Sequence, residues 1–166
     1  LRTEIKPLIR SGGEKSGLVV ALNLVRYVAG IPIEFPLVAN KMFGVMERNA
    51  SCFNIHFSTL DRTTSYFYNF VMWSTITWVF HLLHPGLRGS FIGKSLKVYG
   101  LMVLFFASVS AIYMNHYIHP KAFYIYNILD ALIIFPIVAV ANGLLYPLLM
   151  AGRGESPPPG NPSGIP

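Results

Sequence analysis

Three long stretches of this chain carry almost no charge, and their length limits the fold more than any other feature. Residues 65–83 and 98–118 contain no Asp, Glu, Lys or Arg, and residues 122–151 contain only Asp130. A helix of about 20 predominantly apolar residues is long enough to cross a bilayer core. The sequence therefore predicts an all-α, polytopic helical membrane protein with a transmembrane helix in each stretch.

The composition of the whole chain agrees with a membrane environment. Charged residues make up 12% of the 166 residues and hydrophobic residues 53%, whereas a soluble domain has about 25% charged residues. The net charge is +6, but the basic residues are dispersed and no nucleic-acid-binding motif frames them, so we expect no nucleic-acid partner. Cys52 is the single cysteine, which excludes an internal disulfide and a multi-cysteine metal site.

The first third of the chain is predicted to form an amino-terminal arm, residues 1–64, ahead of a transmembrane domain, residues 65–151. Within the arm, residues 17–39 are apolar but are interrupted by Arg26, Glu34 and two prolines. The cleanest part of this segment would extend only about 21 Å as a helix, which is too short to span unaided. We expect an amphipathic helix that is interfacial or half-spanning, with a broken fourth span as the alternative.

The two ends of the sequence carry different signals. Residues 152–166 contain five prolines and four glycines, a composition that cannot form a packed core. We expect this tail to be disordered alone and residues 157–166 to lie extended against the surface of a partner. The sequence starts with Leu1 rather than Met, which is compatible with a removed organelle leader.

Asp130 is the most unusual residue of the predicted spans. A carboxylate inside an apolar span costs about 2.5 to 3.5 kcal/mol on insertion scales, so such residues usually face protein or water. One interpretation is a proton or ion relay. The other is a polar contact to a neighbouring helix or subunit, which Asn127, one turn earlier, would share.

Two histidine pairs lie at the ends of predicted spans. His81 and His84 are three residues apart, as are His116 and His119, and this spacing places both rings of a pair on one helical face. The two spans are antiparallel, so the pairs fall on opposite membrane surfaces. We predict no metal and no cofactor; contact with haem or quinone at His81 and His84 is the alternative to ordinary interfacial hydrogen bonds.

Three spans in about 150 residues, with histidines at the end of one span, resemble the membrane-anchor subunits of succinate:quinone reductases. The resemblance covers topology, and no residue of that family's quinone site is carried over to this chain. It implies a redox or proton-transfer role beside a larger enzyme.

Two further groups of residues predict contacts rather than chemistry. Small side chains three and four positions apart in the second span allow two helices to approach closely. The predicted packing residues are these small residues, Ala107, Ser108, Ser110 and Ala111, together with Asp130 of the third span. Basic residues between the first two spans would attract an anionic lipid headgroup such as that of cardiolipin, namely Arg88, Lys94 and Lys97.

The chain contains no catalytic signature, such as a nucleophile elbow, a phosphate-binding loop or a zinc-protease motif. We therefore expect a non-enzymatic accessory subunit that stabilises a large energy-transducing complex. A respiratory complex or the ATP synthase of the mitochondrial inner membrane is the favoured setting, with other transmembrane subunits and lipids as partners. The alternatives are a redox or proton-transfer anchor that uses Asp130 or His81 and His84, and a secretory-pathway membrane protein, for which a glycan on Asn49 would be the signature.

Overall fold

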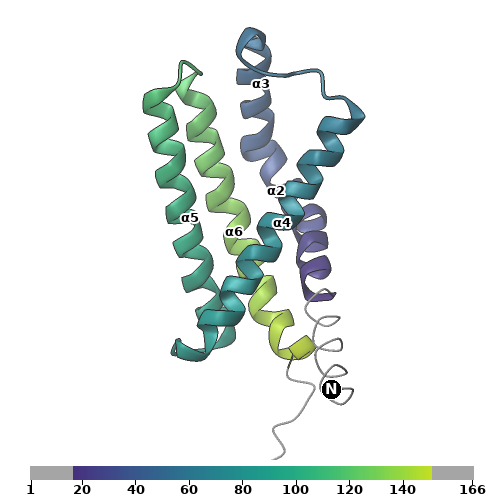
Figure 1. Ribbon diagram of the computed structural model, residues 1–166, viewed down its shortest axis with the longest axis vertical. Helices are drawn as coiled ribbons and strands as arrows, with labels where there is room; N and C mark the ends of the chain where they lie inside the picture. The colour runs from purple at the N-terminus through teal and green to yellow at the C-terminus, as the bar shows by residue number, and fades with distance from the viewer. Residues whose placement is uncertain (1–16, 151–166) are drawn as a thin grey trace, which may run out of the picture.

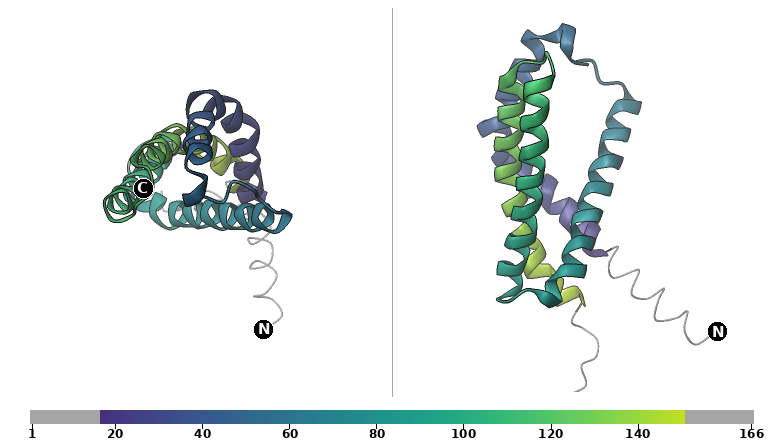
Figure 2. Two further views of the ribbon diagram at one scale, coloured as in Figure 1. Left: turned by 90° about the horizontal axis from the view of Figure 1, so that it is seen from above. Right: turned by 60° about the vertical axis from the view of Figure 1, so that its left-hand side comes forward.

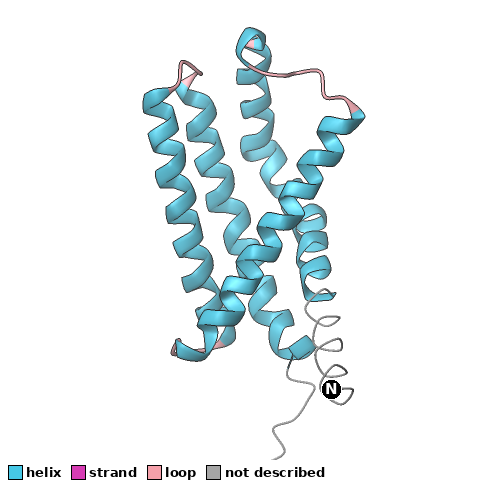
Figure 3. Ribbon diagram, in the orientation of Figure 1, coloured by secondary structure: helices cyan, strands magenta, loops and turns pink. Residues whose placement is uncertain are grey.

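The computed structural model describes residues 17–150, and within this range the chain is helical and contains no strand (Figure 3). Three helices are long and apolar enough to cross a membrane: Gly17–Arg48, Phe91–His116 and Lys121–Leu149. The predicted class, an all-α polytopic membrane protein, is confirmed.

Four long helices alternate in direction along the long axis of the molecule (Figure 1). The amino-terminal helix, Gly17–Arg48, is followed by α4, Thr59–Leu83, by α5, Phe91–His116, and by α6, Lys121–Met150. The start of the amino-terminal helix and the end of α6 consequently lie at the same end of the bundle (Figure 1). The predicted tail, residues 152–166, lies outside the described residues.

The amino-terminal helix is longer than the segment expected from the sequence. It contains two π-helical turns, Arg26–Gly30 and Phe35–Ala39, on either side of α2, Ile31–Glu34, and it ends with α3, Asn40–Arg48. Prolines 32 and 36 lack the N–H that a regular helix requires and would normally break it. The wider turns restore continuity: the Asn40 N–H, for example, donates to the carbonyl of Phe35, five residues earlier.

The transmembrane helix expected at residues 65–83 forms the larger part of α4, but α4 is not among the described helices that are long and apolar enough to cross a membrane. Its Ser, Thr, Tyr, Trp and His residues lower its hydropathy although its aromatic rings remain large apolar groups. It begins with a capping box, in which Ser58 and Asp61 satisfy each other's backbone N–H groups.

The helices α5 and α6 form an antiparallel hairpin and pack along their whole length (Figure 1). The two helices approach closely at Gly143, where an added Cβ would lie 2.5 Å from Cα of Ile92. One position earlier, Nδ2 of Asn142 donates a 3.0 Å hydrogen bond to Oγ of Ser95, and both side chains are fully buried. Small and hydrogen-bonded side chains therefore hold this pair of helices together.

The core lies where all four helices meet, in the lower half of the bundle as drawn in Figure 1. The amino-terminal helix contributes its first turns, and α4 contributes only its second half. Aromatic rings fill much of the interior; its largest buried side chains are Trp73, Phe80, Tyr99, Leu18 and Leu22.

Candidate polar site between the helices

A buried ion pair lies within the amino-terminal helix. Nη2 of Arg26 donates to Oε1 of Glu34 at 3.0 Å, and the two side chains are 13% and 9% exposed. From the sequence alone, both residues are expected to interrupt this apolar segment. In the structure they neutralise each other, which makes it feasible for this helix to lie in an apolar environment.

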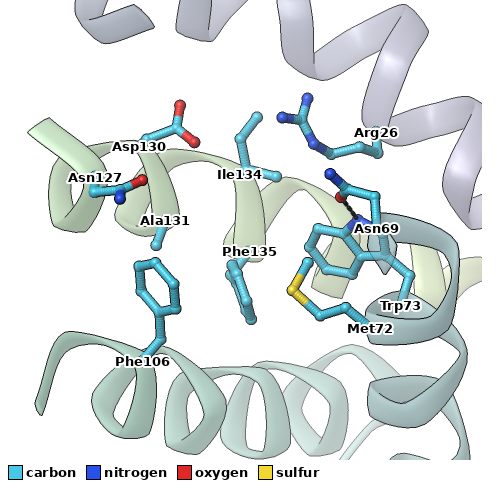
Figure 4. A pocket seen from close by; sticks show the side chains of 10 residues that line it. All are labelled: Arg26, Asn69, Met72, Trp73, Phe106, Asn127, Asp130, Ala131, Ile134 and Phe135. Carbon is cyan, nitrogen blue, oxygen red and sulfur yellow. Dashed lines mark hydrogen bonds between the residues drawn. The ribbon is translucent and has the colours of Figure 1, made fainter. Parts of the chain in front are cut away.

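Arg26 also lines a cavity of about 190 Å³ between the helices. Asp130 and Asn127 of α6 lie on one side, Asn69 and Trp73 of α4 lie on another, and the Arg26 guanidinium points toward the centre (Figure 4). We call this the polar cavity; its remaining lining residues are Met72, Phe106, Ala131, Ile134 and Phe135.

Three buried polar atoms of this ion pair and of Asp130 have no hydrogen-bond partner among the described residues. They are Nη1 of Arg26, Oε2 of Glu34 and Oδ1 of Asp130. Arg26 and Asp130 line the same cavity, Glu34 is paired with Arg26, and the charges of both residues act on Asp130. The three side chains therefore form one electrostatic unit, the Arg26–Glu34–Asp130 cluster.

Within the Arg26–Glu34–Asp130 cluster, Glu34 lies near the middle of the amino-terminal helix, and Asp130 lies about one third of the way along α6. Asp130 is nine positions after Lys121, and Glu34 is seventeen positions after Gly17, so at about 1.5 Å per residue they lie about 14 and 26 Å from those helix ends. A polar group within the apolar part of a membrane helix has little access to headgroups and bulk water. The cluster must be satisfied by protein or by cavity water.

Aromatic packing forms the wall of the polar cavity beside α4. Nε1 of Trp73 donates to Oδ1 of Asn69 at 3.2 Å, which fixes both side chains. The Trp73 ring lies 5.0 Å from that of Phe135 and 6.4 Å from that of Tyr99, centroid to centroid. The polar cavity therefore borders directly on the aromatic part of the core.

Asp130 was singled out from the sequence, whereas Arg26 and Glu34 were not recognised as its neighbours. The available signal was the opposite charge of two residues inside one apolar segment. Their separation of eight residues is not a standard helical pairing distance, so the pattern did not point to a contact.

The histidine pairs lie away from the polar cavity and make separate contacts. Nδ1 of His81 is 2.6 Å from Oη of Tyr146, and Nδ1 of His84 is 2.9 Å from the carbonyl of His81. At the other end of α5, His116 bonds to its own helix, and Nδ1 of His119 lies 3.1 Å from Oη of Tyr124. Among the described residues, no group of three or more His, Cys, Asp or Glu side chains is placed to hold a metal ion.

The predicted lipid-binding residues gather around the turn before α5. Nζ of Lys97 donates to the carbonyl of Arg88 at 3.0 Å, and Nζ of Lys94 lies 5.5 Å from the ring centroid of Phe91. Arg88 itself is exposed. The three charges therefore lie at one end of the bundle, where a headgroup would be.

The predicted small-residue patch on α5 is divided between two faces. Ser110 is buried, and Ala107 and Ala111 are half-buried. Ser108 is exposed, and its hydroxyl donates to the carbonyl of Leu104 in its own helix at 2.8 Å. Ser108 therefore faces outward, as a residue two positions from Ser110 must on a helix.

Comparison of the chain with models of known protein families, with curated proteins and with solved structures gives no match. Any function must therefore be inferred from the residues of the bundle.

Proposed function

We propose that this chain is a non-catalytic helical subunit that packs against other transmembrane proteins and stabilises a large membrane assembly. One observation carries the proposal: the first half of α4, residues 59–72, contains no buried residue. The buried residues of α4, from Trp73 to Phe80, all belong to its second half.

The first half of α4 diverges from the rest of the bundle (Figures 1 and 2). Large apolar side chains are exposed around its circumference, including Phe67 at 61%, Leu60, Tyr68 and Phe70. Tyr66 makes an edge-to-face contact with Tyr27 of the amino-terminal helix, with 5.8 Å between ring centroids. A helix half exposed in this way must be covered by lipid or by another protein.

The composition of the first half of α4 favours a protein partner. Aromatic rings are enriched at protein interfaces, where they fill pockets on the partner. Three of the hydroxyl groups of α4, those of Thr63, Ser74 and Thr75, donate to carbonyls of their own helix and need no acceptor on a partner. An apolar helix of another subunit can therefore pack against these three hydroxyl groups without leaving them unsatisfied.

We assign the assembly to the mitochondrial inner membrane, as a respiratory complex or the ATP synthase. The excess of basic over acidic residues, the aromatic helices and the absence of a catalytic motif in the sequence support this assignment. Arg88, Lys94 and Lys97 would contact an anionic lipid headgroup, at about 1 kcal/mol for each basic residue near the surface.

The test is extraction of the tagged chain from native membranes in mild detergent, followed by native gel electrophoresis and mass spectrometry. We expect the chain to migrate in a stoichiometric, large complex. The variant Phe67→Ala with Phe70→Ala should reduce the fraction in that complex. A matched variant on the outer face of α5, Leu104→Ala with Phe105→Ala, should leave it unchanged. Migration of the unaltered chain as a small free species would contradict the proposal.

A further inference from the structure

We propose that Glu34 and Asp130 hold one exchangeable proton between them inside the bundle, with Arg26 balancing the remaining negative charge. This proton site goes beyond the packing function and does not depend on it. It rests on the charge count of the Arg26–Glu34–Asp130 cluster, on the unpartnered atoms of the cluster and on the adjoining cavity.

The charge count requires one proton for neutrality. The guanidinium of Arg26 is always protonated in proteins, so the cluster contains one fixed positive charge and two carboxyl groups. With both carboxyl groups ionised, the cluster has a net charge of −1 in an apolar region, where an uncompensated charge is costly. With one carboxyl group protonated, the cluster is neutral.

The carboxyl oxygen atoms that have no hydrogen-bond partner give a second reason to expect this proton. Glu34 is only 7% exposed, and its Oε2 has no hydrogen-bond partner among the described residues, nor does the buried Oδ1 of Asp130. An ionised carboxylate can only accept hydrogen bonds, whereas a carboxylic acid has an O–H donor. A proton on either group therefore supplies a donor that two ionised groups lack.

Among the described residues that line the polar cavity, Arg26 is the only cation. Arg26 and Asp130 are the charged residues that line the polar cavity, and α4 and α6 contribute the neutral carboxamides of Asn69 and Asn127. The contribution of α5 is the ring of Phe106. The other titratable groups nearby are the phenols of Tyr27 and Tyr66, which interact with each other beside Arg26. None of these groups can neutralise the second carboxylate.

The polar cavity allows this proton to exchange. Its volume of about 190 Å³ leaves room for several water molecules, which need polar partners such as Asp130 and the carboxamides. Proton release breaks an O–H bond of the acid, transfers H⁺ to cavity water and leaves the cluster at −1. Proton uptake reverses the step and restores neutrality.

The test is infrared spectroscopy of the purified full chain in lipid nanodiscs at neutral pH. We expect a carboxylic acid C=O band that shifts in D₂O. Glu34→Gln and Asp130→Asn should each abolish the band, because either variant leaves one carboxylate to balance Arg26. Arg26→Gln should increase the band about twofold, because two carboxyl groups then lack a cation. The control Asp61→Asn, at the exposed start of α4, should leave the band unchanged.

The fold of each variant is checked by its elution as a single species and by the fluorescence of its tryptophans, one of which lines the polar cavity. The spectrum of the unaltered chain tests the inference without any variant. Absence of a carboxylic acid band in that spectrum would overturn it, as would a band that does not shift in D₂O. A band that is lost in Asp130→Asn but retained in Glu34→Gln would overturn the sharing of the proton.

Discussion

Arg26 and Glu34 are eight residues apart on one helix, yet their side chains meet at 3.0 Å. In a regular α-helix of 3.6 residues per turn, residues eight apart are rotated by about 80° from each other. The π-helical turn Arg26–Gly30 accommodates an additional residue. Two turns then take up about eight residues, and the two side chains come onto the same face. The irregular turn therefore creates the ion pair.

Removal of Arg26 alone should destabilise the bundle strongly. Arg26→Leu leaves two buried carboxyl groups without a cation, and breaking a buried pair in this way costs about 3 kcal/mol or more. Adding Glu34→Leu should recover most of the loss, because an apolar replacement of a whole pair is often neutral. The measurement is reversible unfolding in mixed micelles. Arg48→Leu, at the exposed end of the same helix, should change stability by less than about 0.5 kcal/mol. Equal effects of Arg26→Leu and Arg48→Leu would refute the ion-pair argument.

Gly143→Ala should separate α5 from α6. The new Cβ would lie 2.5 Å from Cα and 2.8 Å from N of Ile92, and backbone atoms cannot yield as a flexible side chain does. We expect a loss of about 1 to 3 kcal/mol, typical of overpacking. The matched control is Gly100→Ala on α5, where an added Cβ meets nothing within 4 Å. That substitution should be neutral or should stabilise the helix by up to about 1 kcal/mol. Thermal unfolding in one lipid mixture compares them, and an unaffected Gly143→Ala would contradict the close approach.

The Asn142–Ser95 hydrogen bond should contribute a small coupling energy. Both side chains are fully buried, and the bond joins α5 to α6 at 3.0 Å. Interhelical hydrogen bonds in membranes average about 0.6 kcal/mol in double-mutant cycles, with about 1.7 as the highest value. The cycle consists of Asn142→Ala, Ser95→Ala and the double variant. Strictly additive effects would show that the bond contributes nothing to stability.

Asp61 should make the stability of the start of α4 depend on pH. The hydroxyl and the backbone N–H of Ser58 donate to its carboxylate and hold the pKa of Asp61 below its usual value. Because the pKa is lower in the folded state, the stabilisation is present above the unfolded pKa and is lost as pH falls through the folded pKa. NMR titration of the Asp61 carboxyl measures this directly. Ser58→Ala should return the pKa toward its usual value, and Ser51→Ala should not. An unchanged titration in Ser58→Ala would refute the capping argument.

The long helices could be predicted from the sequence because charge-free runs of about 20 residues have few other solutions. The length of the amino-terminal helix could not be predicted in this way. Pro32 and Pro36 indicated breaks, and the sequence pattern contains no signal that two π-helical turns would carry the helix past them. The divergence of α4 depends on which of its faces find neighbours, and this is a property of the packed bundle.

The candidate site was only partly predictable. Asp130 stands out because a lone carboxylate in an apolar run is rare. Its partnership with Glu34 and Arg26 depends on two helices meeting at one depth, and on a helical turn that departs from the regular period. Periodicity arguments assume a regular helix, so they place Arg26 and Glu34 on different faces.

The central claim is that the exposed first half of α4 is covered by another protein. Site-specific photo-crosslinking in native membranes tests it most directly, with a photoreactive phenylalanine in place of Phe67 or, as the control, in place of Phe105 on the outer face of α5. The two side chains have similar exposure, 61% and 68%. We predict that position 67 crosslinks to one defined protein and that position 105 crosslinks mainly to lipid. Crosslinks to lipid alone at position 67 would contradict the account.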